Sequence, residues 1–215
     1  VEMPLILTLK KLGWTYITPA ENVRLRAGSM DEVLIKSYVV DTLLKLNAHK
    51  GLNKAHCETL YHRLSRIDDN EEFHSWLKSE KSFKPNPESK AISIDLINKA
   101  HPEDNHFVVT NQYVCAITKP EDAQKHIRPD LMLFVNGIPI TVIECKFLGT
   151  EGSNYAEGIK QLDRYQRTTP KLFIPNVFNV STDGHMFKYG ATKSPAEYYF
   201  EWKYDCGTPN DIIEN

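Results

Sequence analysis

The most constraining feature of this sequence is a pair of apolar runs, 131–135 and 138–147, separated by Asn136-Gly137. An Asn-Gly pair between two such runs is the strongest short signal for a β-hairpin. Both runs are apolar on both faces of the expected strands, which indicates that both faces are covered. The sequence therefore predicts a central hairpin in a covered sheet, and an α/β fold.

The segments around the hairpin divide into a helical part and a strand-rich part. Before it, apolar spacing predicts a helix over 4–12, a second opened by the Ser29–Glu32 capping box, a third opened by Gly51 or Asn53, and a short one at Asn70. Later segments predict strands over 92–96, 106–118, 173–182 and 185–189, a helix over 153–168, and a loop over 81–90. We expect one domain over 1–215, with a helical lobe at about 31–80 and a catalytic core at about 91–190.

Composition excludes several classes of protein. With 41% apolar residues in 215, the chain can bury a real core, and no apolar run approaches the roughly 18 residues of a membrane span. The net charge of -2 suggests no overall affinity for nucleic acid but permits a local basic stripe. The four cysteines are far apart in the sequence, which predicts buried, reduced thiols in a cytoplasmic protein. The start at Val1 suggests a processed chain, an excised domain or missing first residues.

The residues typical of chemistry lie at the ends of the hairpin. Asp130 begins its first strand, and Glu144 and Lys146, two residues apart, leave the same face of its second strand. A two-residue turn would place Asp130 opposite Ile143, whereas a bulge or a three-residue loop would bring Asp130 and Glu144 onto one face. The sequence leaves this register open, although Pro139 favours an irregularity.

Two carboxylates and a lysine at the end of a buried hairpin need compensation, which a divalent cation supplies. Oxygen ligands suit Mg²⁺, so we expect Asp130, Glu144 and the Cys145 carbonyl as metal ligands. Lys146 would hold or deprotonate the attacking water, or stabilise developing charge. The alternative interpretation of these residues is a turn beside a surface ion pair.

The helix predicted at 153–168 adds a second group of polar residues. Gln161 and Tyr165 lie one turn apart on one face. A basic stripe runs beside them, formed by Lys160, Arg164, Arg167 and Lys171. Beside a metal site, this stripe is interpreted as a track for a phosphodiester backbone; otherwise it is a solvated helix face. His126 could face a phosphate, but an ordinary polar role in a loop is favoured. Arg24 and Arg26 could contact DNA or partner subunits, but a solvated loop is favoured.

The combination of Arg128-Pro129-Asp130, Glu144-x-Lys146 and Gln161-x-x-x-Tyr165 resembles the PD-(D/E)xK nuclease superfamily, in the subgroup with a Q-x-x-x-Y motif. More narrowly, residues 128–146 resemble the N-terminal nuclease domain of the R (restriction, motor) subunit of type I restriction enzymes. The resemblance implies a restriction-endonuclease-like core and Mg²⁺-dependent cleavage of double-stranded DNA. It also implies metal binding by Asp130 and Glu144, catalysis by Lys146, and support of the site or of DNA by Gln161 and Tyr165. Glu2 stands where many members carry a further glutamate, and Cys145 replaces a frequent aliphatic residue.

The resemblance implies partners that this chain does not itself specify. The family's R subunits work with modification and specificity subunits and use ATP, but no P-loop sequence occurs here, so ATP use is expected outside these residues. Two other functions stay open. One is a non-cleaving module with a nuclease fold that docks DNA or partner subunits, and the other is a stand-alone nuclease.

Overall fold

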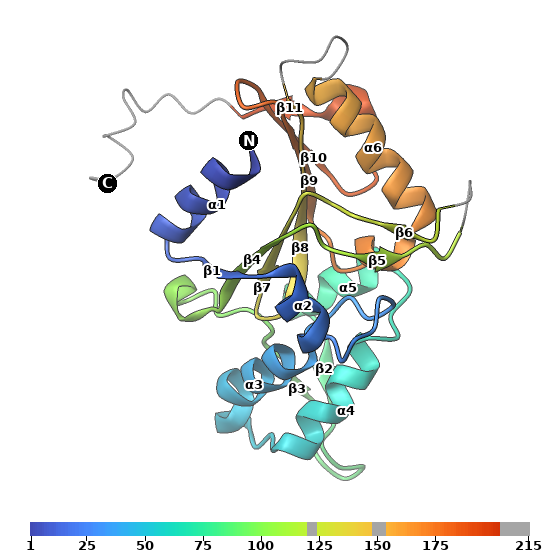
Figure 1. The fold of residues 1–215 in the computed structure, drawn as a ribbon. Coiled ribbons are helices and arrows are strands. Elements are labelled where there is room, and N and C mark those ends of the chain that lie inside the picture. Colours follow the sequence, from blue (N-terminus) through green and yellow to red (C-terminus); the bar gives the residue numbers. More distant parts are fainter. Residues whose placement is uncertain (120–123, 148–153, 203–215) are drawn as a thin grey trace.

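A mixed seven-stranded sheet forms the centre of the protein, whose computed structural model describes residues 1–119, 124–147 and 154–202 (Figure 1). The strand order is β1-β4-β7-β8-β9-β10-β11. Pairing is parallel between β1 and β4 and between β8 and β9, and antiparallel elsewhere. The strands are β1 (Thr15–Ile17), β4 (Phe107–Asn111), β7 (Leu131–Val135), β8 (Ile138–Cys145), β9 (Phe178–Thr182), β10 (Phe187–Ala191) and β11 (Phe200–Glu201). The sheet and its helices confirm the predicted α/β fold with a nuclease-like core.

The predicted hairpin is β7 and β8, and it lies in the middle of the sheet. Leu133 pairs with Thr141, but Phe134 pairs with Pro139, so Ile140 is an extra residue on β8. The bulge leaves the Ile140 carbonyl free to accept hydrogen bonds from the Val177 backbone at 2.9 Å and the Asn176 amide at 3.2 Å. The irregularity favoured by Pro139 is therefore present, and it shifts the register of the strand ends by one residue.

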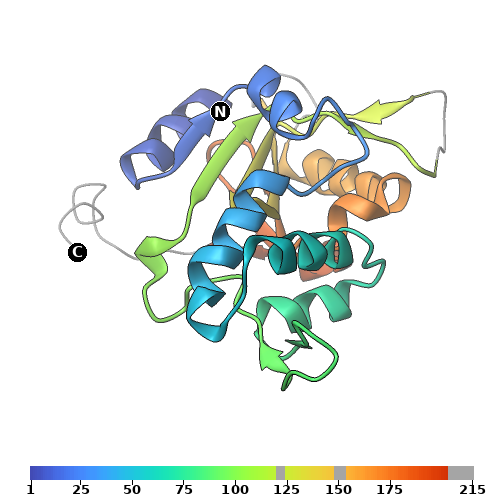
Figure 2. The same ribbon diagram turned by 90° about the horizontal axis from the view of Figure 1, so that it is seen from below.

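Helices cover both faces of the sheet, as the apolar hairpin predicts (Figures 1 and 2). The helix α1 (Glu2–Lys11) packs its Ile6 against one face, with Val109, Leu131, Leu133 and Ile143. The other face contributes Val108, Met132, Phe134 and Val142 to the larger core, which includes α6 (Tyr155–Thr168) and the helical lobe. Alternation along the strands thus places Asp130, Met132 and Phe134 on the side of α6.

The helical lobe consists of α3 (Lys36–Asn47), α4 (Lys54–Leu64) and α5 (Asn70–Leu77), with a 3-10 turn at Ala48–Lys50. Asn53 caps α4 through a capping box with His56, which confirms the predicted start, and Asp69 rather than Asn70 caps α5. The helix expected to open at Ser29 begins only at Lys36. The Ser29 hydroxyl does accept from the Asp31 and Glu32 backbones, but these bonds close a turn.

A segment without a sequence prediction, β1 followed by α2 (Pro19–Leu25), adds an edge strand and one short helix. Arg26 follows α2 and is 2% exposed, so its assignment to a solvated loop is wrong. Its guanidinium donates to Asn22, Glu32 and Val114, and it lies 4.3 Å from the centre of the Tyr113 ring. The contacts of the buried Arg26 guanidinium link α2 to the segment that follows β4.

The remaining predicted strands are shorter than expected. The run 106–118 splits into β4 and β5 (Cys115–Ala116), and β5 pairs with β6 (His126–Ile127) in a separate ribbon. The predicted loop 81–90 contains β2 (Ser82–Phe83), paired with β3 (Ile92–Ser93), and the residues after Ser93 are not a strand. The run 173–182 begins as a 3-10 turn (Pro170–Phe173) before β9. Two further 3-10 turns span Pro102–Asp104 and Ala196–Tyr198.

The cysteine prediction is confirmed for Cys57 and Cys115, which are free and buried. Cys145 is free but only partly buried, and Cys206 lies outside the described residues. Within the described ranges, none of the helices has both the length and the apolar character needed to span a bilayer.

Gly158 sets how closely α6 approaches the sheet. A Cβ at this position would lie 2.1 Å from the Ser181 hydroxyl and 3.5 Å from the Glu144 Cβ. We expect Gly158→Ala to lower the free energy of unfolding by about 1–3 kcal/mol, because close-packed layers resist an added methyl group. Urea unfolding measures this loss, and the double variant Gly158→Ala/Ser181→Gly should recover part of it. Equal stabilities of Gly158→Ala and the wild type would contradict this packing.

Candidate active site

The bulge in β8 brings Asp130 and Glu144 together. Leu131 pairs with Ile143, so the next pair outward is Asp130 with Glu144. The Asp130 Oδ2 accepts a hydrogen bond from the Cys145 backbone N–H at 2.7 Å. This bond fixes the first carboxylate against the end of β8, on the side of the sheet that faces α6.

Glu144 is a fully buried carboxylate, with 0% exposure. Neither of its oxygens has a hydrogen-bond partner in the structure. Burial, and then the neighbouring Asp130 carboxylate, raise the pKa of Glu144 to about 8, against the opposing effect of Lys146. A buried carboxylate without hydrogen bonds is unfavourable, and one lysine at ion-pair distance compensates it only in part, which indicates that the site is built for a further positive partner.

Lys146 and the predicted helix pair form a chain of contacts beside the two carboxylates. The Lys146 Nζ lies 3.5 Å from Glu144 Oε2 and donates a hydrogen bond to Gln161 Oε1. The Gln161 amide in turn donates to the Tyr165 hydroxyl. Burial and the Glu144 charge raise the pKa of Tyr165 to about 12, so this hydroxyl stays protonated. The structure therefore brings all the sequence-predicted site residues into one cluster.

The donor set fits a hard cation that keeps several water ligands. Two carboxylates converge, and one of them has both oxygens unpartnered. Across residues 1–119, 124–147 and 154–202, no group of three or more His, Cys, Asp and Glu side chains is arranged to hold a metal. A metal here would therefore depend on Asp130, Glu144, main-chain oxygen and water, which is typical of Mg²⁺ rather than of zinc. Burial raises the pKa of the Cys145 thiol to about 12, so a thiolate ligand is not expected.

A cleft of about 590 Å³ opens beside Asp130, whereas Glu144 lies buried behind it and does not line the cleft. Its lining includes Asp130, Gln161 and Tyr165, together with basic residues of the β5–β6 ribbon and Arg164 of α6. Of the basic stripe expected on α6, only Arg164 lines this cleft. The other three members pair with acidic side chains: Lys160 with Glu157, Arg167 with Asp163, and Lys171 with Glu32.

Gln112 is a site residue that the sequence reasoning did not assign. Its amide donates to both oxygens of Glu2, at 3.1 and 3.2 Å, and to Asp130 Oδ1 at 3.4 Å. Its backbone N–H donates to the Asp130 carbonyl at 2.8 Å, and its φ of 49° is left-handed. Gln112 therefore joins the start of α1 to the first carboxylate. Gln112 lies inside the run 106–118 predicted as one strand, and that pattern does not reveal a left-handed residue.

The variant Gln112→Gly tests the role of the Gln112 amide without adding backbone strain. Glycine accepts the left-handed φ without cost but removes the amide that holds Glu2 and Asp130 together. The free energy of unfolding should change by less than about 1 kcal/mol, while the DNA cleavage expected from the sequence should fall about tenfold.

Lys193→Gly is the matched control, because Lys193 is exposed, has a φ of 66° and does not line the cleft. This variant should cut DNA as the wild type does. If Gln112→Gly also cuts at the wild-type rate, Gln112 does not position the site.

A mixed sheet with two carboxylates and a lysine at the end of its central hairpin defines an α/β domain of the nuclease-like type. The family model described as type I restriction enzyme R protein N terminus matches residues 1–198. The chain belongs to this family.

Relatives of the chain carry the same family name. It is 24% identical over 213 residues to the type I restriction enzyme HindI endonuclease subunit of Haemophilus influenzae, covering 94% of this chain and 20% of that protein. It is 27% identical over 218 residues to the putative type I restriction enzyme MjaIXP endonuclease subunit of Methanocaldococcus jannaschii, with the same coverage of 94% and 20%. The putative MjaVIIIP subunit of that organism is 30% identical over 172 residues, covering 77% and 16%. The chain thus spans about a fifth of the length of the first two relatives.

Proposed function

We propose that this chain is the Mg²⁺-dependent endonuclease domain of a type I restriction enzyme R subunit, and that it hydrolyses phosphodiester bonds of double-stranded DNA. The observation that carries the proposal is the register that places Asp130 next to the buried Glu144, whose oxygens make no hydrogen bond and which has the Lys146 ammonium 3.5 Å away. Membership of the R protein family supports the reaction class.

Each residue has a distinct chemical role in this proposal. Asp130 and Glu144 would hold Mg²⁺, with the Cys145 carbonyl as a further ligand; when bound, the ion lowers the pKa of water and offsets phosphate charge. The Lys146 ammonium orients the attacking water and stabilises the negative charge that develops on the phosphate oxygens. Gln161 holds the Lys146 ammonium in place, and the Tyr165 hydroxyl fixes Gln161.

Partners and further activities follow from the proposed subunit. Modification and specificity subunits of a restriction complex would supply the recognition of a DNA sequence. ATP binding and DNA translocation would belong to the part of the R subunit outside these 215 residues. The relatives are about five times longer than the matched segment, which leaves room for those activities.

The roles are separated by comparing metal binding with cleavage. Mn²⁺ binding is measured by calorimetry without DNA, and cleavage is followed on linear duplex DNA with Mg²⁺. We expect Asp130→Asn to lose both, because it removes a ligand charge. Lys146→Met should keep metal binding and lose cleavage by about a hundredfold or more, because its ammonium acts on the reacting water. Full cleavage by Lys146→Met, or full metal binding by Asp130→Asn, would contradict the assignment.

A further inference from the structure

The β5–β6 ribbon carries basic side chains into the same cleft as Asp130. Lys125, His126 and Arg128 are exposed and line the cleft together with Asp130. Asp130 is the acidic residue of that lining. The net charge of the chain is -2, so the basic lining of this cleft is a local concentration of positive charge and does not follow from the overall composition.

The chain places the side chains of His126 and Arg128 on the same side as Asp130, the proposed metal ligand. Exposure alternates along the segment, with His126 and Arg128 exposed and Ile127 and Pro129 buried. β6 ends at Ile127, and Arg128 and Pro129 connect it to Asp130 before β7; His126, Arg128 and Asp130 all line the cleft, so they face it together.

Hydrogen bonds hold the ribbon in place beside α6. The Thr118 and Lys119 backbone N–H groups both donate to the Thr168 carbonyl at 3.0 Å. The Arg164 guanidinium donates to the Gln124 side chain at 2.8 Å. The positions of the basic groups are therefore set by the fold and not only by flexible side chains.

The charges of the ribbon are available to a ligand. Across residues 1–119, 124–147 and 154–202, no ion pair involves Lys125, His126 or Arg128, whereas Lys160, Arg167 and Lys171 of the α6 region are paired with carboxylates. Guanidinium and ammonium groups in an exposed row are suited to the phosphates of a nucleic-acid backbone.

We propose that Lys125, His126 and Arg128 form a phosphate track that holds the DNA backbone next to the phosphodiester bond cleaved at Asp130. This inference rests on the proposed function and deepens it, because it assigns substrate binding to the ribbon in place of the α6 stripe. The track recognises backbone charge and carries no base preference of its own.

The test measures binding apart from chemistry. Fluorescence anisotropy with a labelled 25-base-pair duplex in EDTA, over a series of salt concentrations, gives the dissociation constant and its salt dependence. We expect Arg128→Gln and Lys125→Gln each to weaken binding severalfold and to reduce the slope of log affinity against log salt by about one. Arg128→Lys keeps the charge and should keep the slope. Lys54→Gln, an exposed lysine at the start of α4, is the matched control and should bind as the wild type does.

Two results would overturn the track. One is wild-type affinity and slope in both Arg128→Gln and Lys125→Gln, and the other is no measurable binding of the duplex by the wild type. Because EDTA prevents cleavage, the outcome is independent of the chemistry. Unchanged binding in these variants, with Mg²⁺-dependent cutting by the wild type, would remove the track and leave the proposed function standing. Weakened binding in these variants, without any cutting by the wild type, would support the track and contradict the proposed function.

Discussion

Replacing Glu144 by glutamine is expected to stabilise the metal-free protein and to abolish its cleavage of DNA. The carboxylate is fully buried and has no hydrogen-bond partner, and its pKa is raised to about 8 from 4.5. The folded state therefore retains a proton that the unfolded chain releases, so wild-type stability declines as pH rises from about 4.5 to 8. Glutamine does not titrate and avoids this decline.

The effect is measured by thermal unfolding in EDTA at pH 6 and pH 9. At pH 9, Glu144→Gln should melt about 2–4 °C or more above the wild type, and the difference should shrink at pH 6. Adding Mg²⁺ at pH 9 should raise the melting temperature of the wild type alone, because the variant lacks a ligand. Cleavage should fall by about a thousandfold, which corresponds to roughly 4 kcal/mol. A variant that is less stable than the wild type at pH 9 would contradict this description of Glu144.

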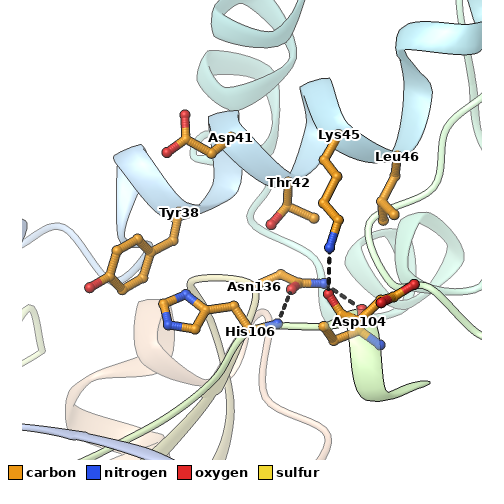
Figure 3. Close-up of a pocket in the computed structure, with 9 residues that line it drawn as sticks. Tyr38, Asp41, Thr42, Lys45, Leu46, Asp104, His106 and Asn136 are labelled. Atoms are coloured by element: carbon orange, nitrogen blue, oxygen red, sulfur yellow. Dashed lines mark hydrogen bonds between the residues drawn. The ribbon is translucent and has the colours of Figure 1, made fainter. Parts of the chain in front are cut away.

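Replacing Asn136 by alanine is expected to cost about 3 kcal/mol of stability or more. Asn136 is 2% exposed, with a left-handed φ of 55°. Its Oδ1 accepts from the His106 backbone at 2.8 Å (Figure 3). Its amide donates to the Leu96 carbonyl at 2.9 Å. Alanine would leave both backbone groups without these partners in a buried place, at about 1–3 kcal/mol each, and would add strain at a positive φ.

The comparison of three variants by urea unfolding separates these contributions. Asn136→Gly removes the side chain but accepts the φ, so it should lose less stability than Asn136→Ala. Asn136→Asp keeps the acceptor for His106 and loses the amide that donates to the Leu96 carbonyl and to the Asn105 side chain. A loss below about 1 kcal/mol in Asn136→Ala would show that the turn does not organise this region. Gly137 next to it has no room for a side chain, since a Cβ would lie 2.8 Å from the Ile35 carbonyl.

The candidate site was predictable because its residues lie close together in the sequence. Asp130, Glu144 and Lys146 flank one hairpin, and Gln161 and Tyr165 share one helix face, so local periodicity was enough to group them. The register of Asp130 against Glu144 was not predictable. The bulge at Ile140 depends on hydrogen bonds to Asn176 and Val177, which are distant in sequence.

Features that depend on long-range contacts were missed or misread. The strand β1 has three residues and gains its pairing from β4, which lies about ninety residues later. Arg26 looked like a loop residue because the carbonyls that bury it come from Glu32 and Val114. Of the three ion pairs of the basic stripe, that of Lys171 with Glu32 was hidden by sequence distance, whereas those of Lys160 and Arg167 are local to α6.

Local sequence signals were also insufficient where the same pattern is compatible with two different local structures. The Ser29–Glu32 capping box makes its expected side-chain hydrogen bonds, yet it closes a turn and not a helix. The strand predicted over 106–118 is interrupted at residues 112–114, because Gln112 adopts a left-handed conformation. That conformation is stabilised by contacts with Glu2 and Asp130, which the sequence pattern does not contain.

The most direct test of the proposed active site is the nicking of supercoiled plasmid by this chain in Mg²⁺ and in EDTA, beside Asp130→Asn. We predict that the wild type converts closed circles to nicked and linear DNA in Mg²⁺ only, and that Asp130→Asn leaves them closed while retaining its fold by circular dichroism. Cutting that persists in EDTA, or in the folded Asp130→Asn variant, would contradict a metal site built on the two carboxylates. Intact plasmid after incubation with the wild type in Mg²⁺ would contradict cleavage by this domain itself.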